Sequence, residues 1–147
     1  MEQEKIFTIT TSDKIINKIK TGDSEFIFNG LCKYENNELY LDYIFFKHFA
    51  STLTYDIILQ VVTNNINNIL KIHNTFIVHA NLRFLTILDI DKHKTFIATL
   101  SNHLKETYPN KLDKCNIYNS PLIFSQLYNI VSLFIDKDTQ KKIKLLS

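Results

Sequence analysis

Glycine and proline are scarce in this chain, which has two of each among 147 residues. Such a shortage of residues that interrupt helices and strands favours long regular elements. Loops that cradle a phosphate need several glycines, because only a glycine backbone comes close enough to the anion. With Gly22 and Gly30 alone, the sequence excludes P-loop proteins and dinucleotide-binding proteins of the Rossmann kind.

Cysteine is equally rare, and Cys32 and Cys115 form no C-x-x-C pair. The first residues include Glu2, Glu4 and Lys5 where a secretory signal peptide would have an apolar run. We therefore expect free thiols in a reducing, cytoplasmic environment. There is no G-x-S-x-G motif, and the five histidines show no metal-binding spacing. Short motifs thus indicate no catalytic centre, no metal site and no cofactor.

Arginine occurs once, as Arg83, and the net charge is +2. The charge is uneven along the chain. Residues 1–91 hold 8 basic and 11 acidic side chains (−3), whereas residues 92–147 hold 9 basic and 4 acidic ones (+5). A nucleic-acid binder would be more basic and richer in arginine, so nucleic acid is not an expected partner. The basic second part indicates a face for an anionic partner or a solvated lysine-rich surface.

Hydrophobic residues make up 45% of the sequence, enough to bury a core, and the length predicts one domain. The first part of the chain is expected to begin with an extended arm or strand at 5–10, followed by a helix at 12–20 that ends at Gly22. Strands at 25–33 and 38–46 are then predicted to form a β-hairpin that turns at Asn36-Asn37. An apolar stripe then predicts a helix from Thr52 or Thr54 to about Ile72.

The segment 75–91 is ambiguous, because it fits one long strand or a strand at 75–82 followed by a loop and a helix from about Asp89. Strands at 115–119 and 142–146 and a helix at 122–135 complete the pattern. The order β-β-α-β-α-β-α-β predicts an α/β fold with a mixed, mostly parallel five-stranded sheet and crossover helices.

Charged residues are absent from 115–135, the longest such stretch in the chain. The predicted helix 122–135 carries its polar residues in one narrow stripe formed by Ser125, Asn129 and Ser132. A helix that faces water shows a wider polar face. We expect this helix either to be buried on nearly all sides or to cover something apolar that is not protein. Its 14 residues fall short of the about 20 that a bilayer crossing needs.

The order of short patterns in the last forty residues resembles the CRAL-TRIO lipid-binding domain, found in phosphatidylinositol-transfer proteins and in tocopherol and retinal carriers. The matching residues are Tyr108-Pro109, Asn119-Ser120-Pro121, Phe124, Phe134-Ile135-Asp136, and Thr139 with Lys142-Ile143. The resemblance favours the strand at 75–82 followed by a loop and helix. It implies a non-catalytic protein that binds a single phospholipid, with an anionic inositol head as the expected ligand.

The resemblance also implies the site residues. The apolar helix would be a gate that opens for lipid exchange over an acyl-chain pocket, and gate and pocket together would comprise Phe76, Val78, Tyr118, Phe124, Leu127, Tyr128, Val131 and Phe134. The lipid head would meet the T-x-x-K motif and its surroundings, which are Thr139, Lys142, Asn110, Lys111 and Lys141.

Three departures from the family pattern carry expectations of their own. Asn110 replaces an acidic residue, which would admit a more highly phosphorylated inositol. Ser132-Leu133 replaces Lys-Pro, which would straighten and lengthen the gate helix. No helical N-terminal subdomain is recognisable, so residues 1–147 are expected to be a minimal lipid-binding domain. Its exposed apolar edges predict a homodimer, and its ligand predicts peripheral association with a membrane surface.

Two other functions stay open. A divergent domain of this family can act as an interaction or membrane-recruitment module with a filled pocket. Alternatively, Asp89 and Asp91 follow an apolar run, and two carboxylates at a strand end can hold a divalent cation in a phosphate enzyme. At a helix start the same two acids would only complement the helix dipole.

Overall fold

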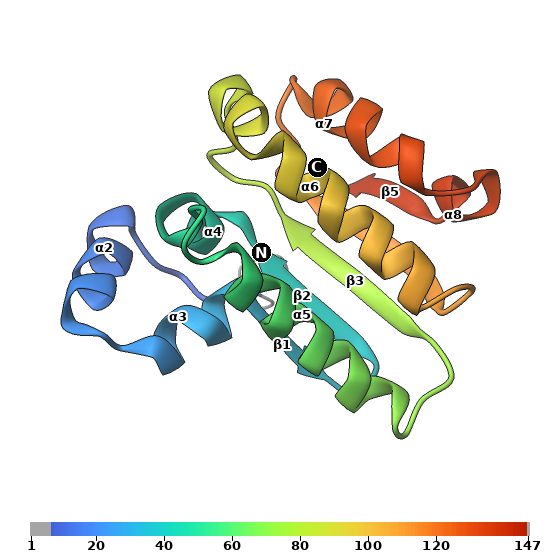
Figure 1. The fold of residues 1–147 in the computed structure, drawn as a ribbon, viewed down its shortest axis with the longest axis horizontal. Helices are drawn as coiled ribbons and strands as arrows, with labels where there is room; N and C mark the ends of the chain where they lie inside the picture. Colours follow the sequence, from blue (N-terminus) through green and yellow to red (C-terminus); the bar gives the residue numbers. More distant parts are fainter. Residues whose placement is uncertain (1–6, 147) are drawn as a thin grey trace.

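The computed structural model describes residues 7–146 (Figure 1). The strands are β1 (Cys32–Glu35), β2 (Glu38–Asp42), β3 (Phe76–Asn81), β4 (Leu112–Tyr118) and β5 (Ile143–Leu146). The helices are α2 (Ser12–Thr21), α3 (Ser24–Leu31), α4 (Tyr43–Phe49), α5 (Tyr55–Leu70), α6 (Ile87–Thr107), α7 (Phe124–Val131) and α8 (Lys137–Lys141), with the 3-10 turn η1 (Ser132–Phe134) after α7. The predicted arm at 5–10 lies partly outside the described residues, and residues 7–10 form no helix or strand.

The five strands lie in sequence order across one sheet. β1 and β2 pair antiparallel, as the hairpin prediction requires, and the remaining neighbours pair parallel. The predicted mixed, mostly parallel sheet is therefore confirmed. Crossovers between parallel strands are right-handed. Because β2 to β5 follow one another across the sheet in a single direction, the helices that connect them lie on the same face. Figure 1 shows α5 and α6 in front of the sheet accordingly.

The hydrophobic core lies between this face and the helices. Leu39 from β2, Phe45 from α4 and Ile66 from α5 are all at most 1% exposed. Gly30 allows α3 to pack closely on α4, because a Cβ atom there would come 2.1 Å from the Phe45 ring. The side chains of α2 and α3 join the same core, so the first part of the chain is packed onto the sheet domain.

Two helix predictions are confirmed, with small shifts at the ends. α2 begins after Thr11, whose side chain accepts a hydrogen bond from Lys14 N, and ends at Gly22 with φ 75°. In α5 the predicted apolar stripe is buried, with Ile58 and Ile66 at 3% and 0% exposure. The asparagines of α5 do not interrupt it, because Asn65 and Asn67 bond to the Val61 carbonyl and the Tyr108 hydroxyl.

The predicted strands at 25–33 and 38–46 are each only partly correct. Residues 24–31 form the helix α3, where the Asp23 side chain caps the first turn and Ile27 and Leu31, one helical turn apart, are buried. Aromatic and branched residues favour strands locally, but burial against the core outweighs that preference. The second strand ends at Asp42, whose carboxylate accepts a hydrogen bond from Ile44 N and begins α4.

The predicted helix at 122–135 is shorter than expected. Its α-helical part is Phe124–Val131, and the chain continues as the 3-10 turn η1, where the Ser132 hydroxyl bonds back to the Asn129 carbonyl. Such bonds from serine to the preceding turn compete with regular helix. The expectation of a longer gate helix is therefore wrong, and α7 has no fully buried side chain.

Polar and aromatic side chains occupy the other face of the sheet. His79 on β3 lies between Glu38 and Tyr118, with its two ring nitrogens 2.9 Å and 2.8 Å from their oxygens. Phe7 packs edge-on against the Tyr118 ring, at a centroid distance of 5.3 Å. The segment that contains Phe7 therefore lies against the face opposite α5 and α6.

Candidate functional site

The candidate site is an apolar cavity of about 170 Å³ between the sheet and the helices α5 and α6. It is lined by Leu31, Leu41, Asp42, Tyr43, Phe46, Ile58, Val61, Val62, Ala80, Asn81, Leu82, Leu85, Phe96, Ile97, Leu100 and Leu127. Apolar cavities of about 150 Å³ stay dry and accept a benzene-sized group. The cavity can thus hold part of a hydrocarbon chain.

Three polar residues in the lining, Asp42, Tyr43 and Asn81, come from the carboxyl ends of β2 and β3 and the start of α4. Burial raises the pKa of the Asp42 carboxyl to about 6, although Arg83 acts in the opposite direction. The Asp42 Oδ2 atom is 3.9 Å from Arg83 Nη2 and has no hydrogen-bond partner within residues 7–146. This end of the cavity therefore contains an incompletely satisfied ion pair.

The predicted gate helix α7 lies beside α6, and Leu127 is its residue in the cavity lining (Figure 1). The other predicted gate residues are half-buried around it, namely Phe124, Tyr128, Val131 and Phe134. The Phe124 and Tyr128 rings contact each other at a centroid distance of 6.1 Å. α7 thus contributes one side chain to the cavity lining, and its apolar side chains are partly rather than fully buried.

The remaining predicted pocket residues lie elsewhere. Phe76 is in the core, edge-on to the Tyr108 ring, and Val78 packs against the same core. Tyr118 lies on the other face of the sheet with His79. The lining residues Phe46, Leu85 and Ile97 were not predicted for the pocket. Their convergence from three elements has no signal in a single sequence.

The predicted head residues gather at the opposite end of the strands. Lys142 Nζ donates a 2.7 Å hydrogen bond to the carbonyl of Leu112, the first residue of β4 and the neighbour of Lys111. Asn110, with φ 61°, forms the preceding turn. Thr139 and Lys141 lie on the short helix α8, directly before β5. Lys142 therefore lies next to the start of β4, and the role of these residues as a head site stays a prediction.

Asp136 and Lys105 complete this end of the molecule and were not predicted to take part. The Thr139 backbone N–H, 2.7 Å from Asp136 Oδ1, lowers the pKa of that carboxyl, and the charges of Lys142 and Lys105 lower it further. Lys105 comes from the last turn of α6. Two lysines, one from α6 and one from the end of α8, therefore place positive charge near one ionised aspartate.

The cavity and the predicted head residues are well separated. The cavity is lined by the carboxyl ends of β2 and β3, whereas Lys142 and Lys111 lie at the amino ends of β4 and β5. The seven residues of β4 span about 20 Å at the usual rise of a strand. A ligand that used both sites would have to extend along the sheet.

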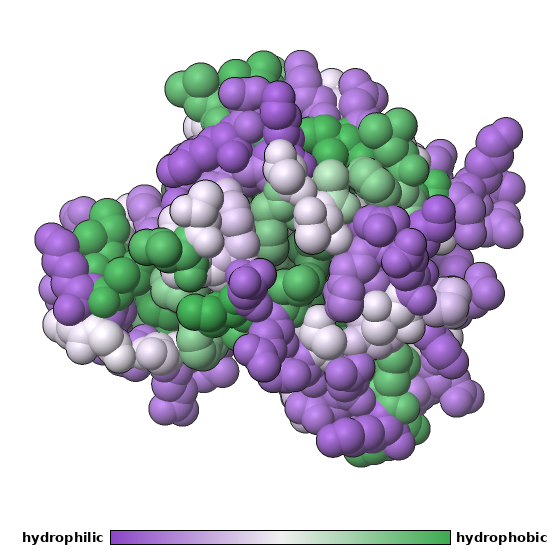
Figure 2. Space-filling view, in the orientation of Figure 1, coloured by the Kyte–Doolittle hydropathy of each residue, from purple (hydrophilic) through white to green (hydrophobic). Residues whose placement is uncertain are grey.

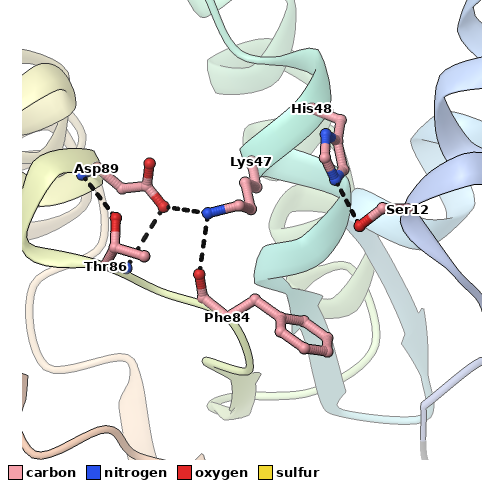
Figure 3. A network of polar contacts seen from close by, with 6 residues as sticks. All are labelled: Ser12, Lys47, His48, Phe84, Thr86 and Asp89. Atoms are coloured by element: carbon pink, nitrogen blue, oxygen red, sulfur yellow. Dashed lines mark hydrogen bonds and ion pairs between the residues drawn. The ribbon is translucent and has the colours of Figure 1, made fainter.

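The carboxylates of the alternative metal site are engaged in other contacts. Asp89 closes a capping box with Thr86 and lies 2.8 Å from Lys47 Nζ, which also bonds to the Phe84 carbonyl (Figure 3). Burial alone would raise the pKa of Asp89, but the hydrogen bond and charge of Lys47, together with the other groups around the carboxylate, outweigh burial and lower that pKa. Asp91 is exposed and pairs with Lys94. Within residues 7–146, no group of three possible ligands could hold a metal ion. The contacts indicate a helix start, not a metal site.

Within the described part of the chain, none of the helices has the length and hydrophobicity to cross a bilayer. Comparison with families of known proteins gives one match, to the CRAL/TRIO domain over residues 54–147. The chain belongs to the CRAL/TRIO family. The match includes α5, the three strands β3 to β5 and both ends of the candidate site. Membership supports a lipid-binding or lipid-transfer protein.

Solved structures agree with the fold. The crystal structure of Sfh5 superposes with a TM-score of 0.66 at 16% identity, over 79% of this chain and 46% of that chain. The chain therefore spans less than half the length of Sfh5. No curated protein sequence matches the chain. At 16% identity the likeness establishes the CRAL/TRIO fold, and the ligand must be argued from the site.

Proposed function

We propose that this CRAL/TRIO chain binds one phospholipid, phosphatidylinositol or a phosphoinositide, and presents it or transfers it between membranes without making or breaking a bond. The observation that carries the proposal is the apolar cavity of about 170 Å³ beneath Leu127 of α7. Hiding a 16-carbon acyl chain from water stabilises it by about 12 kcal/mol, at about 0.8 kcal/mol per methylene. The donor bilayer already provides this stabilisation, so exchange into a cavity is close to neutral.

Entry of an acyl chain requires the cavity to grow, since it accommodates only part of one. α7 is the element that can move, because it contains no fully buried side chain and begins at Ile123 without a side-chain cap. Its displacement exposes little core surface. We assign the gate to its apolar residues Phe124, Leu127, Tyr128 and Val131, together with Phe134 of η1.

The lipid head would bind at the amino ends of β4 and β5. Lys142 uses one N–H on the Leu112 carbonyl, and an ammonium group has three donors, which leaves two for a phosphate. Thr139, Lys111, Lys141 and Asn110 surround it as hydrogen-bond donors and positive charges. A diacyl lipid would then lie along the sheet, with its chains reaching the cavity about 20 Å away.

The proposal includes a place of action. A carrier of a membrane lipid must touch a bilayer, so we propose a cytoplasmic protein that is peripherally associated with membranes. A homodimer through exposed apolar surface is part of the same proposal.

A second function is favoured by the size of the cavity. Ligand pockets usually have volumes of about 300–1,000 Å³, and this one is smaller. A CRAL/TRIO domain whose pocket stays filled by its own side chains would act as an interaction or membrane-recruitment module.

Organic extraction of the purified protein followed by lipid mass spectrometry separates the two functions. A carrier should release one phospholipid per chain, whereas an interaction module should release none. The substitution Ile97→Trp should fill the cavity, since Ile97 lines it. Loss of the extracted lipid in Ile97→Trp, with unchanged circular dichroism, would assign the cavity as the acyl site.

Binding to vesicles doped with individual phosphoinositides tests the head site. Lys142→Ala should lose selectivity for inositol heads, and Lys92→Ala, an exposed lysine at the other end of α6, serves as the control. If both variants keep the wild-type preference, the head does not bind at the T-x-x-K motif.

A further inference from the structure

Four large apolar side chains protrude from two loops of the structure. Phe84, Ile87 and Leu88, at the β3–α6 connection, are 61%, 51% and 77% exposed, and Leu122, between β4 and α7, is fully exposed. Figure 2 shows hydrophobic surface at the upper edge, over the start of α6. We call these four residues the loop-tip residues. Burial in the core does not account for them.

The two loops are joined to each other. Leu82 N donates to the Tyr118 carbonyl at 3.0 Å, and Asn119 Nδ2 donates to Asn81 Oδ1 at 3.0 Å. The loops follow neighbouring parallel strands, so they leave the sheet at the same end. The loop-tip residues therefore belong to one end of the molecule.

Charge is nearly absent from these loops. Among the twelve residues 82–88 and 119–123, Arg83 is the only charged one, and it is basic. The whole chain is 22% charged, so such a length would ordinarily carry two or three charges of both signs. An apolar tip with a single arginine complements an anionic lipid surface, where apolar side chains enter the interface and the arginine reaches the phosphates.

The shape of the β3–α6 loop is held in place. Phe84 adopts φ 67°, a conformation that bulky side chains rarely take. Its carbonyl accepts a hydrogen bond from Lys47 Nζ at 3.1 Å, and Lys47 also pairs with Asp89 at the start of α6 (Figure 3). These contacts stabilise a loop that presents its phenylalanine outward, a use of local strain that is typical of functional segments.

The same loop reaches the cavity. Leu82 and Leu85 line it, while their neighbour Phe84 is exposed. A hydrocarbon chain that entered between the loops would pass the Asp42–Arg83 pair and then reach the apolar lining.

We propose that the loop-tip residues are the surface that docks on a lipid bilayer, with Phe84 and Leu88 entering its interface and Arg83 contacting anionic head groups. This inference rests on the proposed function and adds to it the place of contact. That place is at the cavity end of the sheet, opposite the lysines of the T-x-x-K motif.

A single tryptophan tests the proposal, because the chain contains none. Leu88→Trp should shift its emission to the blue when vesicles of phosphatidylcholine with phosphatidylserine are added, and brominated acyl chains should quench it. Ile72→Trp is the matched control, since Ile72 is 84% exposed and lies between α5 and β3 at the other end of the sheet. Its emission should not change.

A charged substitution gives the second measurement. Leu88→Asp should weaken vesicle binding about tenfold, since it removes the burial of a leucine and adds a negative charge, and Ile72→Asp should not. Equal emission shifts at Leu88 and Ile72, or equal vesicle binding by the two aspartate variants, would overturn the docking surface. The docking surface would also be overturned if the emission of Leu88→Trp shifted to the blue without vesicles, in step with self-association measured by sedimentation as the protein concentration rises. A second copy of the chain would then occupy the tip.

Failure of this inference differs from failure of the proposed function. Phosphatidylinositol delivered from cyclodextrin bypasses the bilayer, so Leu88→Asp should take it up as the wild type does. Ile97→Trp, with the cavity filled, should dock on vesicles normally and take up no lipid from either source. If Leu88→Asp takes up no lipid from cyclodextrin either, the residue supports the fold or the cavity and the docking assignment fails.

Discussion

Asp42 is a buried carboxyl group whose ionisation the fold opposes. Its pKa is raised by burial from 3.8 to about 6, so the folded state binds its proton more tightly than the unfolded chain does. The stabilisation from the neutral acid is complete below about pH 4 and is lost as the pH rises to about 6.

The neutral variant Asp42→Asn should therefore gain stability relative to the wild type over the same interval. Its advantage should reach about 3 kcal/mol above pH 6, at about 1.4 kcal/mol for each unit of pKa. Asparagine also caps helices well, so α4 should keep its start. Urea unfolding at pH 4, 6 and 8 measures this, and an advantage that does not depend on pH would contradict the burial argument.

Phe84 combines an unfavourable backbone conformation with an exposed side chain. Asparagine tolerates positive φ, so Phe84→Asn should stabilise the fold by about 1 kcal/mol. Phe84→Ala is the control, because alanine keeps the steric conflict and should give no such gain. The free energy of unfolding of the two variants decides this. If the alanine variant is equally stable, the φ of 67° is not a source of strain.

At the scale of elements, α7 should be less protected than α6. It has no fully buried side chain, whereas α6 buries Ile90, His93 and Phe96. Amide hydrogens of α7 should exchange with deuterium faster than those of α6 in the lipid-free protein, since local opening exposes little apolar surface. Added phosphatidylinositol should slow exchange in α7 and leave the middle of α6 unchanged. Slow exchange throughout α7 without lipid would contradict a gate.

For the molecule as a whole, the exposed edge at β5 bears on assembly. β5 pairs with β4 and with no other strand within residues 7–146, and the side chain of its Leu145 is 56% exposed. Free strand edges with apolar neighbours favour association. We expect a dimer in sedimentation that Leu145→Lys dissociates and Ile72→Lys leaves intact. A wild-type monomer at all concentrations would refute the predicted homodimer.

The sequence predicted best the elements that carry their own periodicity. The stripe of α5 and the Asn36-Asn37 turn of the hairpin were located from local pattern, and the Asn36 φ of 56° fits that turn. α3 was mistaken for a strand because its aromatic and branched residues favour strands locally, and its helical form depends on packing against α2 and α4. Local preference decides an element only where packing agrees with it.

The candidate site, like the fold, was predicted only in part from the sequence. Lys142 of the T-x-x-K motif contacts Leu112, which follows Lys111 in the chain, while the predicted head site itself stays a prediction. Of the predicted pocket and gate residues, Leu127 lines the cavity. The rest of the lining could not be predicted, because a cavity is the space that imperfect packing leaves between distant elements. No residue type or spacing in the sequence indicates where such a cavity will lie.

By itself, the sequence determined the α/β class, the charge-free stretch 115–135 and the order of the five strands with the crossover helices α5, α6 and α7 between them, because hydrophobic periodicity and turn residues act over a few positions. Only the tertiary structure decided that the apolar side chains of α7 are half-buried, that the cavity is lined by residues at the carboxyl ends of β2 and β3, and that Phe84 and Leu122 protrude at the same end. Parallel pairing brings together loops that are far apart in the chain, and no local pattern contains that pairing.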